Sequence, residues 1–185
     1  MKIKYSIVFW FVFPVLAGCS ALDLGDRTPS GASFSGEWML NISLSDSLEV
    51  GREGLENKQA EYQIRSENLS RPQTSNPFVF ISHDFNVLDA DRLKIELGPD
   101  SVGLRYYPGV YRDVTFGTRD RGLWKVYSGW EDDQMVVLSL AKDLRVMERF
   151  SLVSQNRLKI LIDINADKGK KSLVKVFDRV REFPG

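Results

Sequence analysis

The sequence contains few side chains that could act as nucleophiles or proton carriers. Its 185 residues include one histidine, His83, and one cysteine, Cys19. A catalytic serine needs a base beside it and a turn that presents it, and the chain has no Gly-x-Ser-x-Gly motif. His83 follows a short apolar run and is interpreted as a surface histidine at the start of a loop. We therefore expect no enzymatic activity.

Two acidic clusters are candidate cation sites. Asp163, Asn165 and Asp167 have the spacing that opens a calcium-binding loop. The complete pattern then requires a glycine next and a glutamate at the twelfth position, where this chain has lysine and valine. The acidic run at 131–133 lacks other obvious ligands. Both clusters fit better as turns between strands, and we expect neither a metal nor another cofactor.

Charged residues also occur where strand alternation points toward a core. In the expected strand 110–116, alternation places either Arg112 or Asp113 on the core face. In the expected strand 145–153, it places either Glu148 or Arg149 there. An isolated charge in a dry core is costly. Three arrangements avoid this cost: an internal pair of Arg112 with Glu148, a wet pocket in which they anchor a ligand, or a position at the rim. The sequence leaves all three open.

Two tryptophans share one face of an expected strand. Trp124 and Trp130 are six residues apart, an even spacing that puts both side chains on the same side. Large indoles either line a ligand cavity or fill the interior of a small barrel. Filling is the commoner arrangement, and both residues remain candidates for a pocket.

The overall charge excludes some classes of partner. Lys and Arg together number 25, as do Asp and Glu, so the formal net charge is zero. A nucleic-acid-binding protein needs a basic surface that replaces phosphate counterions. Two short basic loops, 119–121 and 168–171, could contact anionic lipid phosphates, although a solvated loop is the better explanation of each. We expect no nucleic-acid partner.

The N-terminus has the order of features found in secretory signals. Lys2 and Lys4 precede an apolar run at 7–16, which is too short for a membrane-spanning helix of about twenty residues. Small residues follow the run. A charged start, a short apolar region and small residues are typical of a signal peptide, here residues 1–18.

Residues 16–19, with the sequence LAGC, resemble the lipobox of bacterial lipoproteins. The resemblance implies cleavage between Gly18 and Cys19 and acyl chains on Cys19; the alternative is an ordinary signal peptide that ends in cysteine. Two or more chains give stable anchoring. In that family an aspartate after the cysteine retains proteins in the inner membrane. Because Ser20 and Ala21 stand there instead, we expect the outer membrane and a domain that faces the periplasm.

The mature chain divides into a tether and one domain. Residues 19–33 are small and polar and are expected to form a lipidated, flexible tether. Residues 34–185 are long enough for a single core. Within them, residues 45–71 are polar with sparse apolar positions, and are expected to form an excursion over the barrel with a possible helix at 53–66.

Short strands dominate the domain. Residues 34–44 alternate between apolar and polar positions, as in a half-buried strand. Further apolar segments recur at spacings typical of a barrel or sandwich. We predict an all-β, single antiparallel up-and-down barrel of about 8–10 strands, because closure removes exposed edges. The further expected strands are 78–82, 93–97, 102–107, 110–116, 123–130, 135–141, 145–153, 158–164 and 173–180, with turns at 98–101 and 117–122.

The first of these strands resembles that of the lipocalin and calycin barrels. Gly36, Glu37 and Trp38 match the Gly-x-Trp motif with which those barrels begin. The resemblance implies that Trp38 packs across the closed end against an arginine of the last strand, here Arg179. The Thr-Asp-Tyr motif of lipocalins is absent from the sequence, and few residues follow the last expected strand.

Together these observations predict a membrane-anchored lipoprotein that binds an apolar or amphiphilic small molecule in a lipocalin-like barrel. Membrane lipid, through acylated Cys19, is the first expected partner. The candidate pocket residues are Arg112, Glu148, Trp124 and Trp130. The alternative is a filled barrel that docks an envelope protein.

Overall fold

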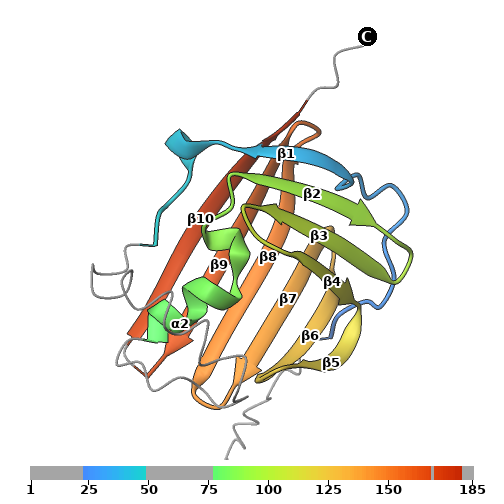
Figure 1. The fold of residues 1–185 in the computed structure, drawn as a ribbon. Coiled ribbons are helices and arrows are strands. Elements are labelled where there is room, and N and C mark those ends of the chain that lie inside the picture. Colours follow the sequence, from blue (N-terminus) through green and yellow to red (C-terminus); the bar gives the residue numbers. More distant parts are fainter. Residues whose placement is uncertain (1–22, 49–76, 168, 181–185) are drawn as a thin grey trace, which may run out of the picture.

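The computed structural model describes residues 23–48, 77–167 and 169–180 (Figure 1). The predicted signal peptide, the lipobox with Gly18 and Cys19, and most of the expected excursion with its helix at 53–66 lie outside the described residues.

The described chain forms a ten-stranded antiparallel sheet that curls into a nearly closed barrel (Figure 1). Strands that follow one another in sequence pair, except β4 and β5, and β1 also pairs with β10, so that the order runs β4-β3-β2-β1-β10-β9-β8-β7-β6-β5. The all-β, up-and-down prediction is confirmed. The strands are β1 (Gly36–Leu40), β2 (Arg92–Leu97), β3 (Ser101–Tyr107), β4 (Tyr111–Thr115), β5 (Gly117–Arg121), β6 (Trp124–Glu131), β7 (Gln134–Ala141), β8 (Leu144–Ser154), β9 (Arg157–Ala166) and β10 (Gly169–Arg179).

Period-two alternation positions the core. In β9, Leu158, Ile160, Ile162 and Ile164 are all buried, and polar or less buried residues stand between them. Because successive side chains point to opposite faces of a strand, this pattern directs one face of each strand into the barrel. Every strand except β5 contributes buried apolar side chains to one continuous core inside the barrel.

Residues 78–82, predicted as a strand, are instead part of a helix. Helix α2 (Pro77–Asp84) lies across the opening of the barrel, in front of β8–β10 (Figure 1). Its first six residues are buried, so the helix contacts the core on more than one side. A short apolar run carries no period that distinguishes a buried strand from a buried helix. Proline favours the first helical position, which Pro77 occupies. Among the described residues, no helix is long and apolar enough to cross a bilayer.

Two predicted boundaries also differ from the structure. Residues 117–122 were expected as a turn, but 117–121 form β5, an edge strand made of polar and charged residues. The first strand ends at Leu40, and a short 3-10 helix, η1 (Ile42–Leu44), follows it. A second 3-10 helix, η2 (Asn86–Leu88), connects α2 to β2. The expected turn at 98–101 is present, with Gly98 N–H donating to Ser101 O at 2.8 Å.

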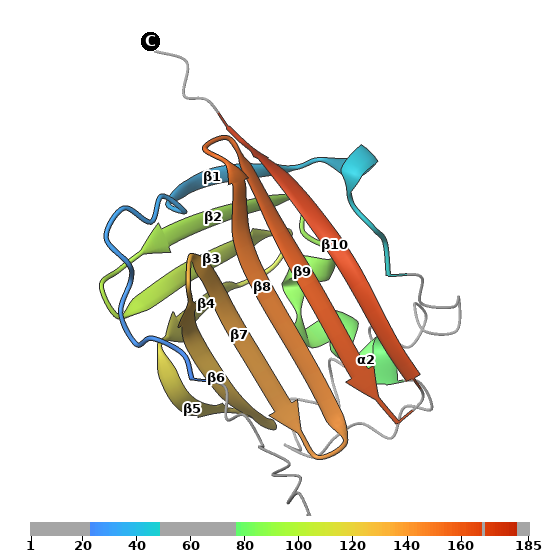
Figure 2. The ribbon, with the colours of Figure 1, turned by 180° about the vertical axis from the view of Figure 1, so that it is seen from behind.

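The part of the expected tether that the structure describes, residues 23–33, is hydrogen-bonded to the barrel. Gly25 and Trp130 exchange two backbone hydrogen bonds of 2.8 and 2.9 Å. Further along, the Thr28 hydroxyl donates to Gly98 O at 2.6 Å. This segment therefore follows the closed end of the barrel before the chain enters β1 (Figure 2).

Candidate ligand-binding site

The barrel is open between β4 and β5, the two edges of the sheet. Side chains bridge part of this gap. Arg119 of β5 donates to Thr115 Oγ1 and to Asp113 O of β4, each at 2.7 Å. The Ser128 hydroxyl of β6 donates to Thr115 O at 2.8 Å. The bonds to Asp113 O and Thr115 O satisfy carbonyl groups of the edge strand β4 that a neighbouring strand would otherwise bind.

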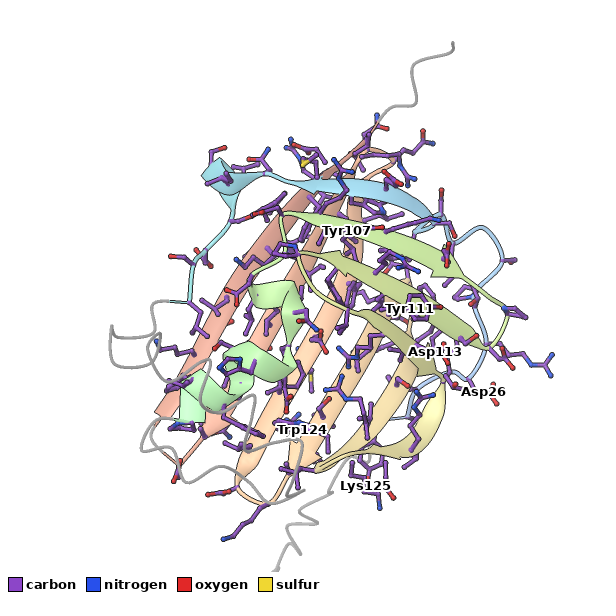
Figure 3. All side chains as sticks on the ribbon, in the orientation of Figure 1. Asp26, Tyr107, Tyr111, Asp113, Trp124 and Lys125 are labelled. Carbon is purple, nitrogen blue, oxygen red and sulfur yellow. The ribbon has the colours of Figure 1, made fainter. Side chains whose placement is uncertain are left out.

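A pocket of about 440 Å³ lies beside this gap, at the end of the barrel covered by α2. Figure 3 shows Tyr111 and Asp113 along β4, with Trp124 below them beside α2. The pocket has three cationic side chains on its walls, and its lining includes His83, Asp84, Arg112, Arg119, Arg121 and Trp124. Its volume is within the range of small-molecule sites, about 300–1,000 Å³.

An ion pair crosses the interior behind the pocket. Arg112 Nη1 on β4 donates to Glu148 Oε2 on β8 at 2.7 Å, and neither side chain is more than 6% exposed. This is the internal pairing, one of the three arrangements considered for these residues, and their burial does not fit the rim. Burial opposes the charge of Arg112, but Glu148 and then Tyr106 outweigh it and raise its pKa.

The pair is incompletely satisfied. Within the described residues, Arg112 Nη2, Glu148 Oε1 and Tyr106 Oη have no hydrogen-bond partner of good geometry, although all three atoms are buried. Burial first, and then the Glu148 carboxylate, raise the pKa of Tyr106. Buried polar atoms of this kind normally bind water or a ligand. Because Arg112 also lines the pocket, its Nη2 offers a donor to a bound molecule.

Arg121 adds positive charge to the same wall. Its Cζ lies 5.6 Å from the centroid of the Phe85 ring, and Arg112 Cζ lies 5.8 Å from that centroid. Burial, and then the charge of Arg112, lower the pKa of Arg121. A lowered arginine pKa means that its surroundings disfavour added positive charge. An anion placed between the two guanidinium groups would relieve this repulsion.

Trp124 connects the helix to the barrel wall. Its Nε1 donates to Asp84 Oδ2 at 2.7 Å, at the end of α2. Its indole stacks on Phe80 with centroids 5.9 Å apart, and Phe85 meets it edge-on at 5.1 Å. These contacts hold α2 over the pocket and give the site an aromatic wall.

The structure brings together only some of the predicted pocket residues. Arg112 and Trp124 line the pocket, and Glu148 lies behind Arg112. Trp130 is at the other end of the barrel, where it packs edge-on against Phe34 and Phe116 at 5.3 and 6.1 Å. It fills the core there rather than lining the pocket.

The sequence indicated Arg119 and Arg121 only as part of a basic loop that could contact lipid phosphates, and not as residues of the pocket. Both are on the inner face of β5, opposite Val126 and Trp124 of β6. Their spacing of two residues was the available signal, and it has meaning only when 117–121 is taken as a strand. His83 also differs from expectation, because it lies in the last turn of α2 and lines the pocket.

The expected turn at Asp163, Asn165 and Asp167 is wrong for the first two, which lie within β9, and only Asp167 is in the turn that follows. Within the described residues, no group of three or more His, Cys, Asp or Glu side chains is arranged to hold a metal ion. Asp163 accepts hydrogen bonds from Arg149 at 3.0 Å and from Ser172 at 2.7 Å. In the other cluster, Glu131 ends β6, and Asp132 and Asp133 form the turn to β7, where Asp132 has a φ of 54°.

The pair implied by the lipocalin resemblance lies at the closed end. Trp38 is fully buried, and Arg179 Cζ lies 4.0 Å from the centroid of its ring. The Trp38 Nε1 also donates to Phe34 O at 3.0 Å.

No family model and no curated protein matches this sequence. Among solved structures, the chain is similar to a luciferase domain from the dinoflagellate Lingulodinium polyedrum, with a TM-score of 0.51 and 10% identity over 89% of this chain and 48% of that one. It is also similar to zebrafish ileal bile acid-binding protein complexed with cholic acid (TM-score 0.41, 15% identity, 80% and 99% covered) and to the fluorescent protein UnaG (0.43, 12%, 81% and 98%). The fold that the structure itself shows is an antiparallel, up-and-down β-barrel. At these identities the likeness concerns the fold alone.

Proposed function

We propose that this chain is a non-enzymatic binding protein for an amphiphilic small molecule that carries an anionic group, anchored by acyl chains on Cys19 to the outer membrane and facing the periplasm. One observation carries the binding proposal. Buried Arg112 lines the pocket beside a second guanidinium, Arg121, and within the described residues its Nη2 has no hydrogen bond of good geometry, with the Tyr106 hydroxyl as its neighbour.

The guanidinium groups of the pocket favour a carboxylate, sulfonate or phosphate head group. Glu148 neutralises Arg112. Arg119 and Arg121 add two further guanidinium groups to the lining, which also contains the carboxylates of Asp84 and Asp113. Guanidinium groups bind planar oxyanions through two parallel hydrogen bonds. A ligand oxyanion would therefore contact Arg121 and accept a hydrogen bond from Nη2 of Arg112.

The other walls suit an apolar body. Trp124 contributes a buried indole, and Leu123 and Val110 at the mouth are 36% and 53% exposed. An amphiphile would cover these groups and remove apolar surface from water. The arrangement of an aromatic wall with a few polar groups is typical of small-molecule sites.

Membrane anchoring rests on the sequence. The LAGC motif at 16–19 follows a charged start and a short apolar run, and the only cysteine of the chain occupies the position that acylation requires. Two or more acyl chains make release from a bilayer slow.

A fluorescent fatty acid tests the binding proposal. We would titrate the protein with 11-(dansylamino)undecanoic acid and with its methyl ester, in the wild type and in Arg121→Gln. A hydrogen bond to a charged group contributes about 1.5–3 kcal/mol, so we expect about tenfold or more weaker binding for the ester and for Arg121→Gln. Arg105→Gln, on the outer face of β3, is the matched control and should bind like the wild type. Equal affinities for acid and ester would overturn the anionic site.

One observation favours the alternative of a protein-docking barrel. Tyr107, Val110 and Tyr111, around the turn between β3 and β4, are 41%, 53% and 47% exposed and form an apolar group at the surface. Tyrosines are enriched at protein interfaces. On this alternative, Val110→Glu would release an envelope protein from cross-linked membranes, and the dansyl probe would not bind.

A further inference from the structure

The outside of the barrel carries a second apolar cluster. Val136 and Leu138 of β7 and Met147 of β8 are buried although they point away from the core. Their neighbours along each strand, such as Val137 and Val146, point inward. The outer face of an antiparallel barrel is normally polar, so a cluster here needs a reason. Figure 2 shows this side of the barrel, formed by β7–β10, toward the viewer.

The N-terminal segment leads to this cluster. Leu24 packs against it, and the next residue, Gly25, pairs with Trp130 at the end of β6. Cys19 precedes the first described residue, Asp23, by only four residues, a span of at most about 14 Å when extended. If Cys19 is acylated, as the proposed function requires, the lipid is attached within that distance of this outer face.

A basic groove of about 500 Å³ adjoins the cluster on the same face. Met147 is part of both, and the groove is lined by residues that include Arg145, Arg149, Lys170, Asp163 and Ser172. Arg145 and Lys170 are exposed. Asp163 already accepts from Arg149 and Ser172, so the remaining charge of the groove is positive.

The edge of the cluster toward β6 also combines a cation with partly exposed apolar side chains. Tyr127 and Leu140 are partly exposed there, and Lys125 Nζ lies 5.8 Å from the centroid of the Tyr127 ring. Lysine and tyrosine together are common where a protein meets the head groups of a bilayer. Cations and partly exposed apolar side chains are thus combined on the face from which the anchor departs.

We propose that this outer face of β6–β10 lies on the bilayer and that the groove at Arg145 and Lys170 binds the phosphate groups of anionic phospholipids. The proposal rests on acylation of Cys19 for its role in the cell, but the contact itself needs no acyl group. A lipid anchor then fixes not only the location of the barrel but also which side of it faces the membrane.

Vesicle binding by an unacylated chain tests the contact separately from the anchor and from the ligand pocket. The protein would be the chain from residue 19 onward with Cys19→Ser, which keeps every described strand and the whole described core. Co-sedimentation would use vesicles of phosphatidylcholine alone and of phosphatidylcholine with 30% phosphatidylglycerol. Arg145→Glu/Lys170→Glu is the test variant. Arg92→Glu/Arg105→Glu, exposed on the outer face of β2 and β3, makes the same change of charge on the other side of the barrel.

We expect binding to the anionic vesicles only, weakened about tenfold or more by Arg145→Glu/Lys170→Glu and by 0.5 M salt, and little changed by Arg92→Glu/Arg105→Glu. Circular dichroism would show that both variants keep the β-sheet spectrum. Equal loss in the two double variants, or equal binding to both kinds of vesicle, would overturn the proposal. Full competition by 5 mM glycerol 3-phosphate would assign the groove to a soluble phosphate and contradict the bilayer contact.

Discussion

Arg179 is fixed over the Trp38 ring by backbone carbonyls from two other segments of the chain. Its guanidinium donates to Ser35 O at 2.6 Å, to Ser33 O at 2.7 Å and to Gln155 O at 2.8 Å. One side chain thus joins the entry to β1, the turn before β9 and the end of β10. The closed end of the barrel is therefore held by a cation stacked on an indole and by hydrogen bonds that satisfy three carbonyl groups.

Truncating the indole tests how much of the core depends on this end. Because Trp38 is fully buried, we expect Trp38→Ala to lower the free energy of unfolding by about 3–5 kcal/mol. Urea denaturation followed by circular dichroism would measure the loss. Val153→Ala, at a side chain that is 62% exposed, is the control and should have little effect. A loss below about 1 kcal/mol for Trp38→Ala would show that the closed end is not part of the core.

Removing one partner of the internal ion pair should lower the free energy of unfolding strongly, whereas replacing both partners by apolar residues should lower it much less. Glu148→Gln leaves the buried Arg112 without its counter-charge, and we expect a loss of about 3–5 kcal/mol. Arg112→Met/Glu148→Leu replaces both charges by apolar groups, and should lie much closer to the wild type in stability. The same denaturation measurement applies to both. A double variant as unstable as Glu148→Gln would mean that the pair is stabilising beyond the cost of a stranded charge.

An ion pair on the outside of the barrel predicts a pH dependence of stability. Hydrogen bonds from Arg157 and then from Asn41 lower the pKa of Asp178. A carboxyl group with a lowered folded-state pKa stabilises the fold above its unfolded pKa of about 3.9, and the contribution is lost as the pH falls through the folded value. We therefore expect Asp178→Asn to be slightly less stable than the wild type at pH 6. The difference should be small, because both side chains are 41% exposed, and it should vanish near pH 2. A difference that grows in acid would contradict this sign.

The proposed anchor predicts that loss of Cys19 changes where the protein is found but not whether it folds. We expect Cys19→Ala to remain folded, because the described strands and core begin after that residue, and to be absent from membranes washed at high salt. Immunoblotting of washed membranes and soluble fractions would measure the distribution. Retention of the variant at wild-type levels would contradict anchoring through Cys19.

Some features of this fold are local in the sequence and some are not. Alternation around 158–164 and the turn at 98–101 predict strands β9, β2 and β3 directly. The inward arginines of β5 hide that strand, because polar residues occupy positions that usually mark the core. The bonds between Gly25 and Trp130 join backbones far apart in the chain, and backbone pairing of this kind leaves no trace in residue type. For the same reason the sequence does not predict that Arg112 and Arg121 line one pocket, because their strands meet only in the folded sheet.

Native mass spectrometry of the protein purified from its own membranes tests the binding function most directly. The proposal predicts one acidic amphiphile per chain, retained by the wild type and by Arg105→Gln and lost from Arg121→Gln. A chain that carries no small molecule, or an adduct held equally by Arg121→Gln, would contradict a ligand site at this pocket.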